Sequence, residues 1–142
     1  MHRRSFVKKS ALLGSGVLMA DQLFAKVNLA PINIAMIGCG DRGKGVLSVI
    51  QKMPLQFKTV AYCDVLDFRL SETKKYVPVS AVAVKDYRKI LDDKKVEAVF
   101  IATPLSEHFK IAKDAVLAGK AVYVEKTMTY NVEEALALRK LV

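Results

Sequence analysis

Three glycines in the chain have the spacing of a phosphate-binding loop. Gly38, Gly40 and Gly43 form a GxGxxG pattern, with Asp41 and Arg42 between the last two. The first glycine permits a tight turn after a strand, the second lets the backbone approach a diphosphate, and the third allows close packing of a helix on the sheet. The amide groups that open the helix would bind the phosphates. The pattern predicts that all five residues contact the diphosphate of a dinucleotide, and a glycine turn without a ligand is the alternative.

A carboxylate follows at the position where such a loop needs a partner for the adenosine sugar. Asp64 ends the next apolar run, 26 residues after Gly38. Its carboxylate can accept hydrogen bonds from both ribose hydroxyls and would repel a 2′-phosphate, which favours NAD over NADP as the cofactor. Arg69 could swing toward a phosphate, but we expect it to be a surface residue first.

Two cysteines, Cys39 and Cys63, flank this predicted cleft. Neither belongs to a CxxC or a Cys/His cluster, so no zinc or other metal site is predicted. The sequence leaves a disulfide open, but favours two small side chains that pack beside the cleft.

The elements that would position these residues alternate between strand and helix. Short apolar runs predict strands, and apolar residues at helical spacing predict the segments between them. Such alternation predicts βαβ units and an α/β fold with a Rossmann-type, doubly wound parallel sheet. The strands are expected at 32–37, 59–63, 81–84, 98–102 and 121–124, and the helices at 43–53, 66–76, 86–91, 106–119 and 131–142.

Helix caps can be placed by residue type. Asp86 and Ser106 are predicted N-caps, and Gly119 is predicted to stop the helix before it. Asn131, with Glu134 three residues later, predicts a capping box at the last helix.

The first 25 residues resemble a twin-arginine export signal. Arg3-Arg4-Ser5-Phe6-Val7-Lys8 matches that motif, and the apolar stretch at 11–20 is too short to span a bilayer. Residues 26–31 would be a linker. An ordinary secretory signal and an amphipathic helix are the alternatives. Because the twin-arginine route carries folded proteins, we expect the protein to bind its cofactor before it meets the twin-arginine export machinery. We expect it to reach the periplasm or another exported location and to keep no stable membrane anchor.

The net charge of +9 does not indicate nucleic-acid binding. Four of the basic residues lie in the first ten positions, and acidic residues are interspersed among the others. Without a basic stripe and interleaved aromatic residues, the charge indicates a solvated, mildly basic surface that favours anionic ligands in general, and no nucleic-acid partner is expected.

Two further motifs give the sequence a family resemblance. Residues 102–108 read ATPLSEH and residues 118–126 read AGKAVYVEK. Together with the glycine loop, these resemble the TP(x)nH and AGKHVxxEKP signatures of the glucose-fructose oxidoreductase / inositol dehydrogenase (Gfo/Idh/MocA) family. The resemblance covers residues 32–142.

This resemblance implies roles for five residues. Thr103 and Pro104 would line the nicotinamide-ribose side of the cleft. His108 would lie near the cofactor as a second catalytic residue beside Lys126, or would merely satisfy a helix start. Glu125 would contact the cofactor, and Lys126 would lie beside the transferred hydride and polarise or deprotonate a substrate hydroxyl, as a lysine of lowered pKa can.

The implied function is an NAD-dependent oxidoreductase that acts on a sugar or polyol. The resemblance leaves two alternatives open, an NAD-dependent glycoside hydrolase of the same family and an NAD-binding module without turnover. Family members continue into a second, C-terminal domain that this chain lacks, so we expect residues 1–142 to be incomplete and inactive alone, and the full-length protein to be a homo-oligomer. Thr127 replaces the family's proline, which is often cis, and Ala121 replaces a common histidine.

Overall fold

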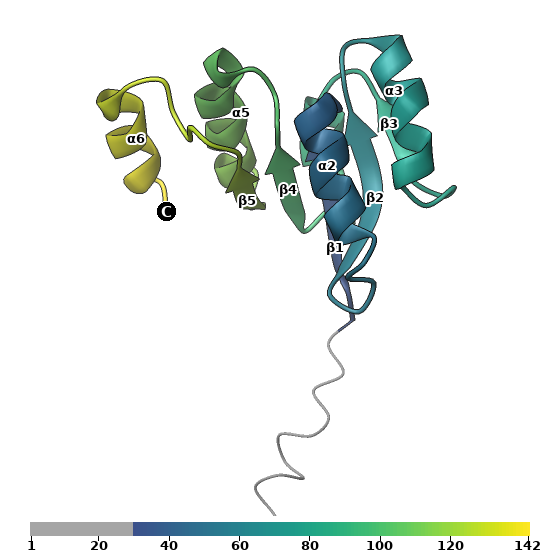
Figure 1. Ribbon diagram of the computed structural model, residues 1–142. Coiled ribbons are helices and arrows are strands. Elements are labelled where there is room, and N and C mark those ends of the chain that lie inside the picture. The colour runs from purple at the N-terminus through teal and green to yellow at the C-terminus, as the bar shows by residue number, and fades with distance from the viewer. Residues whose placement is uncertain (1–29) are drawn as a thin grey trace, which may run out of the picture. The chain divides into compact units, whose positions relative to one another are not determined.

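A computed structural model describes residues 30–142 of the chain. Its centre is one five-stranded sheet in the order β3-β2-β1-β4-β5, with every neighbouring pair parallel (Figure 1). The strand order reverses between β1 and β4, which makes their carboxyl ends a topological switch point, where such sheets bind ligands. The predicted Rossmann-type α/β fold is confirmed. The strands are β1 Ile32–Ile37, β2 Phe57–Cys63, β3 Val82–Val84, β4 Ala98–Ile101 and β5 Ala121–Val124.

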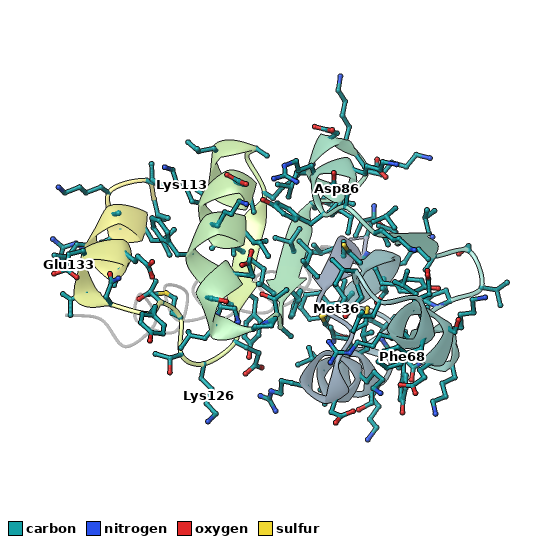
Figure 2. All side chains as sticks on the ribbon, turned by 90° about the horizontal axis from the view of Figure 1, so that it is seen from above. Met36, Phe68, Asp86, Lys113, Lys126 and Glu133 are labelled. Carbon is teal, nitrogen blue, oxygen red and sulfur yellow. The ribbon has the colours of Figure 1, made fainter. Side chains whose placement is uncertain are left out.

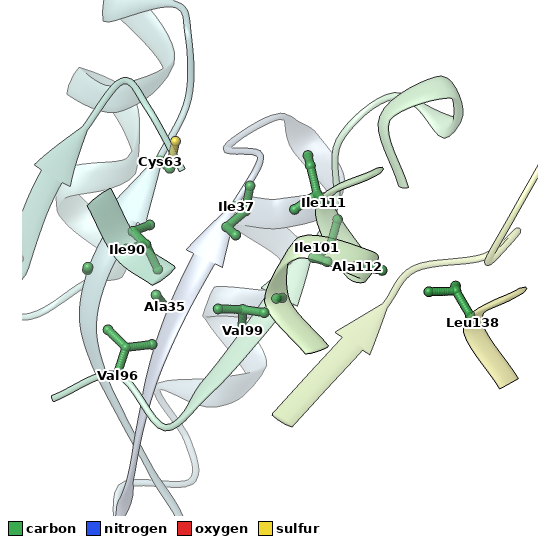
Figure 3. Close-up of a cluster of buried hydrophobic side chains, with 12 residues drawn as sticks. Ala35, Ile37, Cys63, Ile90, Val96, Val99, Ile101, Ile111, Ala112 and Leu138 are labelled. Atoms are coloured by element: carbon green, nitrogen blue, oxygen red, sulfur yellow. The ribbon is translucent and has the colours of Figure 1, made fainter. Parts of the chain in front are cut away.

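Helices cover both faces of the sheet because alternate strand residues point to opposite sides. Met36 packs with Leu47 and Leu70 beneath α2 and α3, whereas its neighbours Ala35 and Ile37 belong to a second cluster beneath α4, α5 and α6. Figure 3 shows this second cluster, with Leu138 reaching it from α6. The helices are α2 Asp41–Ile50, α3 Asp67–Thr73, α4 Arg88–Asp92, α5 Leu105–Leu117 and α6 Val132–Arg139, and the 3₁₀ turn η1 Lys74–Tyr76 follows α3.

The bounds of several elements differ from those predicted. α2 begins at Asp41 with Gly40 as its N-cap, not at Gly43, so the glycine loop itself enters the helix. It ends at Ile50, since turn hydrogen bonds such as Lys52 N–H to Val49 O take over. The predicted helix over 66–76 is α3 plus η1, and the last helix ends at Arg139 instead of the chain end.

Two predicted N-caps are wrong. α5 begins at Leu105 with Pro104 as its N-cap, so Ser106 lies inside the first turn. Proline suits this place because it has no N–H to leave unpaired, and its carbonyl accepts the N–H of Glu107 at 2.9 Å. α4 begins at Arg88 with Tyr87 as its N-cap, so Asp86 lies one residue before the cap, where its carboxylate accepts the N–H of Arg88 at 3.0 Å.

The remaining caps are confirmed. Asn131 Oδ1 accepts the N–H of Glu134 at 2.9 Å, and Glu134 in return accepts the N–H of Tyr130 at 2.9 Å. Gly119 follows α5 with φ +72°, the left-handed conformation that ends a helix.

Within residues 30–142, no helix combines the length and the apolar character needed to cross a bilayer. The predicted signal at 1–25 and most of the linker at 26–31 lie outside the described residues.

Candidate functional site

The glycine loop connects β1 to α2, and two of its glycines are required by the fold itself. A Cβ atom at Gly38, where φ is +97°, would lie 2.5 Å from the carbonyl oxygen of Ala102. A Cβ at Gly43 would lie 2.0 Å from the Gly38 carbonyl oxygen. Both distances are far inside van der Waals contact, so these glycines let β1, β4 and α2 approach one another.

Gly40 has a different environment. Only the Arg69 guanidinium lies within 4 Å of a Cβ built there, the nearest atom at 3.8 Å. No side chain caps α2 at this N-terminus. The loop therefore presents backbone and the positive end of a helix dipole to an open surface, an arrangement suited to an anion.

A cavity of about 580 Å³ lies at the carboxyl ends of the strands beside this loop. Of the residues predicted for the site, Gly38, Asp64, Thr103 and Pro104 line it. Cys63, predicted to flank the cleft, and Arg69, considered for a phosphate, also line it. Sequence reasoning missed the remaining residues of the wall, because only the return of β3 and α5 to the same edge brings most of them there. The cavity is lined by Ile37, Gly38, Cys63, Asp64, Val65, Leu66, Arg69, Lys85, Asp86, Tyr87, Arg88, Ala102, Thr103, Pro104, Glu107 and Ile111.

Asp64 directly follows β2, where the sequence predicted a carboxylate to close the strand, and its carboxylate is already engaged by the chain. Its side chain is 4% exposed. Oδ2 accepts the N–H of Cys39 at 2.8 Å, and Oδ1 accepts the N–H of Leu66 at 3.0 Å. Arg69 Nη1 lies 3.7 Å from Oδ2. Asp64 thus fixes the glycine loop against β2, and each oxygen keeps a lone pair for a further donor.

Thr103 follows β4, and its hydroxyl is the clearest sign of a ligand. Oγ1 is buried and has no hydrogen-bond partner among residues 30–142. Buried hydroxyls are normally paired, because an unpaired one loses its hydration without compensation. The hydroxyl belongs to a residue that lines the cavity, so a bound cofactor with sugar and phosphate oxygens fits the residues present.

His108 lies in the first turn of α5 and is 2% exposed. Nδ1 lies 2.9 Å from the carbonyl oxygen of Thr127, and Nε2 lies 2.9 Å from that of Thr103. A carbonyl only accepts, and a neutral imidazole has one N–H, so only the doubly protonated ring donates to both. The ring is absent from the cavity wall and joins the loop after β4 to the loop after β5.

Arg42 and Glu125, both predicted to contact a cofactor, contact each other. Arg42 Nη2 lies 2.8 Å from Glu125 Oε1, which ties the first turn of α2 to the residue after β5. The Tyr123 hydroxyl also donates to Oε1 at 3.0 Å, a contact that sequence reasoning missed. Arg42, followed by the Tyr123 hydroxyl and the N–H of Lys126, holds the pKa of Glu125 below its usual range against the opposing effect of burial.

Lys126 is exposed and follows this buried carboxylate directly. Figure 2 shows its side chain pointing outward from the loop after β5. No ion pair or side-chain hydrogen bond of its Nζ occurs among the described residues. The peptide bond between Lys126 and Thr127 is cis, the form that the family resemblance associates with a proline at this position.

The two cysteines are free and buried. Cys39 Sγ donates to the carbonyl oxygen of Cys63 at 3.4 Å. Burial is the main reason that the pKa of Cys39 is raised to about 11 and that of Cys63 to about 12. They pack beside the cavity, which agrees with the packing interpretation favoured from the sequence.

Comparison with known proteins adds independent findings to this geometry. Residues 32–142 match the Gfo/Idh/MocA family model, described as an oxidoreductase family with an NAD-binding Rossmann fold. The chain is 34% identical over 111 residues to a glycosyl hydrolase family 109 protein of Streptomyces niveus, an alignment that covers 72% of this chain and 22% of that protein.

Two solved structures share the fold. KijD10, a 3-ketoreductase from Actinomadura kijaniata in complex with NADP and TDP-benzene, has a TM-score of 0.71 at 26% identity, over 78% of this chain and 34% of that one. The apo scyllo-inositol dehydrogenase of Lactobacillus casei also has a TM-score of 0.71, at 27% identity over 79% and 33% of the two chains. The chain thus spans between a fifth and about a third of the length of these proteins.

Proposed function

Because the chain belongs to the Gfo/Idh/MocA oxidoreductase family, we propose that the protein built on this NAD-binding domain removes hydride from a CH–OH group of a sugar or polyol. NAD supplies the hydride acceptor when it is bound. The observation that carries this proposal is the cavity at the switch point, where the glycine loop, Asp64 and the unpaired Thr103 hydroxyl meet. The loop with Lys126 follows the strand beside β4.

In this proposal Lys126 Nζ polarises the substrate hydroxyl or removes its proton. An exposed amine with no partner among the described residues is available for a substrate, which the buried and paired Glu125 is not. The Arg42–Glu125 ion pair and the contact of His108 with the Thr127 carbonyl hold the residues on either side of the lysine. Arg42 and His108 are then positioning residues, and His108 does not itself exchange a proton with substrate.

The binding half of the proposal is tested with Gly40. A Cβ there meets no atom closer than the flexible Arg69 side chain, and the backbone at φ −67° suits any residue. Gly40→Val should therefore fold normally but block approach of the diphosphate, and we expect NAD affinity, measured by calorimetry, to fall at least about tenfold. Gly45→Val in the same helix, where a Cβ meets nothing within 4 Å, is the control and should bind NAD like the unchanged chain. Failure of the unchanged chain to bind NAD would refute the proposal.

A second function is favoured by one specific finding. The Streptomyces niveus relative is a family 109 glycosyl hydrolase, so the complete protein could use a retained NAD for glycoside cleavage with no net redox change. Incubation of the complete protein with nitrophenyl glycosides and no added cofactor separates the two. Release of nitrophenol supports the hydrolase, whereas NADH formed in step with an added free sugar and NAD supports the dehydrogenase. If neither product forms while NAD still binds, the result supports a binding module without turnover.

We also propose that the protein is exported after folding by the twin-arginine route. The support is the Arg3-Arg4-Ser5-Phe6-Val7-Lys8 run and the apolar stretch behind it. A protein that must retain a cytoplasmic dinucleotide needs to fold first, and this route allows that. Replacing both Arg3 and Arg4 by lysine should keep the protein in the cytoplasm, as cell fractionation would measure, whereas unchanged export would favour an ordinary secretory signal.

Light scattering of the complete protein would test the expected homo-oligomer.

A further inference from the structure

A second hollow of the domain lies apart from the dinucleotide cavity, between α5, β5 and α6. It measures about 510 Å³, and apolar side chains line it. Of the described residues that form its wall, only Arg139 carries a charge. Val132 and Leu136 of α6 belong to the wall and are still 68% and 46% exposed. Monomeric proteins leave few such apolar surfaces open, so this groove is typical of an interface.

Helix α6 carries apolar side chains on two sides. Leu138 is buried in the cluster beneath α5, whereas Val132 and Leu136, one turn apart on another side of the helix, are exposed. A helix that packs on one side only has a polar outer side. Among residues 30–142 nothing covers the second apolar side of α6, so the helix is suited to a further partner.

Exposed charges of opposite sign lie at the two ends of this helix. Glu133 is in its first turn, Lys140 directly follows its last residue, and both are exposed. Figure 2 shows Glu133 on the outer side of α6. Neither side chain forms an ion pair with another of the described residues. Because positions 133, 136 and 140 are three and four residues apart, they share one side of the helix, and the two charges flank Leu136.

We propose that a second copy of this chain docks on this groove, with the two α6 helices packed antiparallel about a twofold axis. Such a contact is isologous, so the surface must fit its own copy. The antiparallel arrangement brings Glu133 of one protomer to Lys140 of the partner subunit at both ends, with Leu136 near the axis. It also sets opposite ends of the two helix dipoles side by side. An apolar ligand would fill the groove but leave both charges unpaired, so the charges favour a second copy.

The groove reaches the loop that carries the proposed catalytic lysine. Met128 lines the groove and lies two residues after Lys126. The partner's α6 would therefore lie against this loop. The inference does not depend on dinucleotide binding, and it names the surface for the homo-oligomer expected from the sequence.

Sedimentation velocity on the full 142-residue chain tests this contact. We expect a dimer. Glu133→Lys and Lys140→Glu should each raise its dissociation constant at least about tenfold, because each sets like charges opposite one another at both ends. An equimolar mixture of the two variants should form a heterodimer, since one chain then presents two positive and the other two negative charges. Lys52→Glu, an exposed position after α2 on the opposite face of the sheet, is the control and should dimerise like the unchanged chain.

Leu136→Gln tests the apolar part of the contact. Because Leu136 is half-exposed, this variant should fold and bind NAD like the unchanged chain, yet dimerise at least about tenfold more weakly.

Three results would overturn the inference. They are a chain that stays monomeric up to about 100 μM, a dimer that Glu133→Lys and Lys140→Glu leave unchanged, and a mixture of these two variants that stays monomeric. A monomer that binds an apolar dye, with loss of the dye in Leu136→Gln, would assign the groove to another occupant. Each of these results leaves the proposed function standing, which is refuted only if the unchanged chain fails to bind NAD.

Discussion

The carboxyl edge of the sheet contains two regions that differ in how their polar groups are used. We call Asp64 and Arg69 the adenosine region, and Arg42, Glu125, Lys126 and His108 the lysine region. The adenosine region borders a cavity of about 580 Å³ whose lining includes Arg69, with its unbonded guanidinium, and Thr103, which has a buried and unpaired hydroxyl. In the lysine region the buried charges and ring nitrogens pair with the chain itself, and Lys126 points outward.

This difference separates binding from positioning. Groups left unpaired around a cavity lower their free energy when a ligand supplies partners, so the adenosine region is built to bind. Groups that pair with one another fix backbone geometry, so the lysine region is built to hold a loop in place. Variants in the first should change affinity for dinucleotides, whereas variants in the second should change stability and the placement of Lys126.

The largest effect should come from Gly43, where α2 packs closely against the end of β1. In Gly43→Ala a methyl group would be placed 2.0 Å from the Gly38 carbonyl, so α2 must move away from β1. We expect the free energy of unfolding, measured in urea, to fall by about 3 kcal/mol and NAD binding to be lost.

Gly45→Ala is the matched control from the same helix. No atom lies within 4 Å of its Cβ position, and alanine is the better helix former, so stability should rise by about 0.5–1 kcal/mol. Equal stability of the two variants would mean that α2 is not held as closely as the geometry requires.

The next largest effect tests the lysine region through His108. In His108→Leu the carbonyls of Thr103 and Thr127 would lose their buried donor, and we expect a loss of about 2 kcal/mol in the free energy of unfolding. Amide resonances of Thr127 and Met128 should shift more than those around Asp64. His108→Gln keeps an N–H donor group in a similar volume and should recover part of the loss.

A larger resonance shift around Asp64 than around Thr127 in His108→Leu would contradict the division into two regions. His108 would then support the cavity wall through Thr103, and the loop of Lys126 would be held by Arg42 and Glu125 without it.

Local patterns in the sequence predicted the fold and most of the adenosine region. The strand and helix alternation and the Asn131 cap depend on residues close together in the chain, and both are confirmed. Gly38 and Asp64 line the cavity at the carboxyl ends of the strands, and their contacts with a cofactor stay predictions. Ser106 failed as a cap because Pro104 begins α5 two residues earlier. α2 begins within the glycine loop, at Asp41, and not after it at Gly43. The bounds of both helices depend on the backbone of the preceding turn, which residue types alone do not give.

The pairings between distant residues could not be predicted. Arg42 with Glu125, and His108 with Thr127, join segments that meet only once β4 and β5 lie side by side. The alternation in residues 121–125 offers the one usable signal, because it places Tyr123 and Glu125 on the same side of the strand. The glycine-loop pattern had indicated a cofactor contact for Arg42, and the family resemblance had implied one for Glu125; both roles remain predictions.

A smaller, pH-dependent effect compares the ion pair of the lysine region with an ion pair on the cavity wall. The pKa of Glu125 is lowered from its ordinary value of 4.5, chiefly by Arg42. A lowered folded-state pKa gives stability that is present above pH 4.5 and is lost as pH falls through the folded value. In thermal unfolding, Arg42→Met should therefore be less stable than the unchanged chain at neutral pH, and the difference should shrink below pH 4.5.

Arg88→Met is the comparison from the cavity wall. The pKa of Asp86 is lowered first by the backbone N–H of Arg88, which this variant keeps, and both side chains of that pair are about half exposed. We expect a smaller pH-dependent difference for it, since exposed pairs contribute little. An equal or larger effect for Arg88 would show that the lysine region gains nothing from the burial of Glu125.

The smallest effect concerns the two thiols beside the cavity, and it tests how tightly the adenosine region is closed. Thiolate is the reactive form, and with pKa values of about 11 for Cys39 and about 12 for Cys63, only about one in a thousand and one in ten thousand are ionised at pH 8. Iodoacetamide should therefore leave both unlabelled in the folded chain and label both in urea, as mass spectrometry would record. Rapid labelling of Cys63 alone would mean that the cavity wall around this thiol opens and lets the reagent reach it. If saturating NAD then suppressed that labelling, the opening would belong to the ligand-free adenosine region, because Cys63 lines the cavity wall with Asp64.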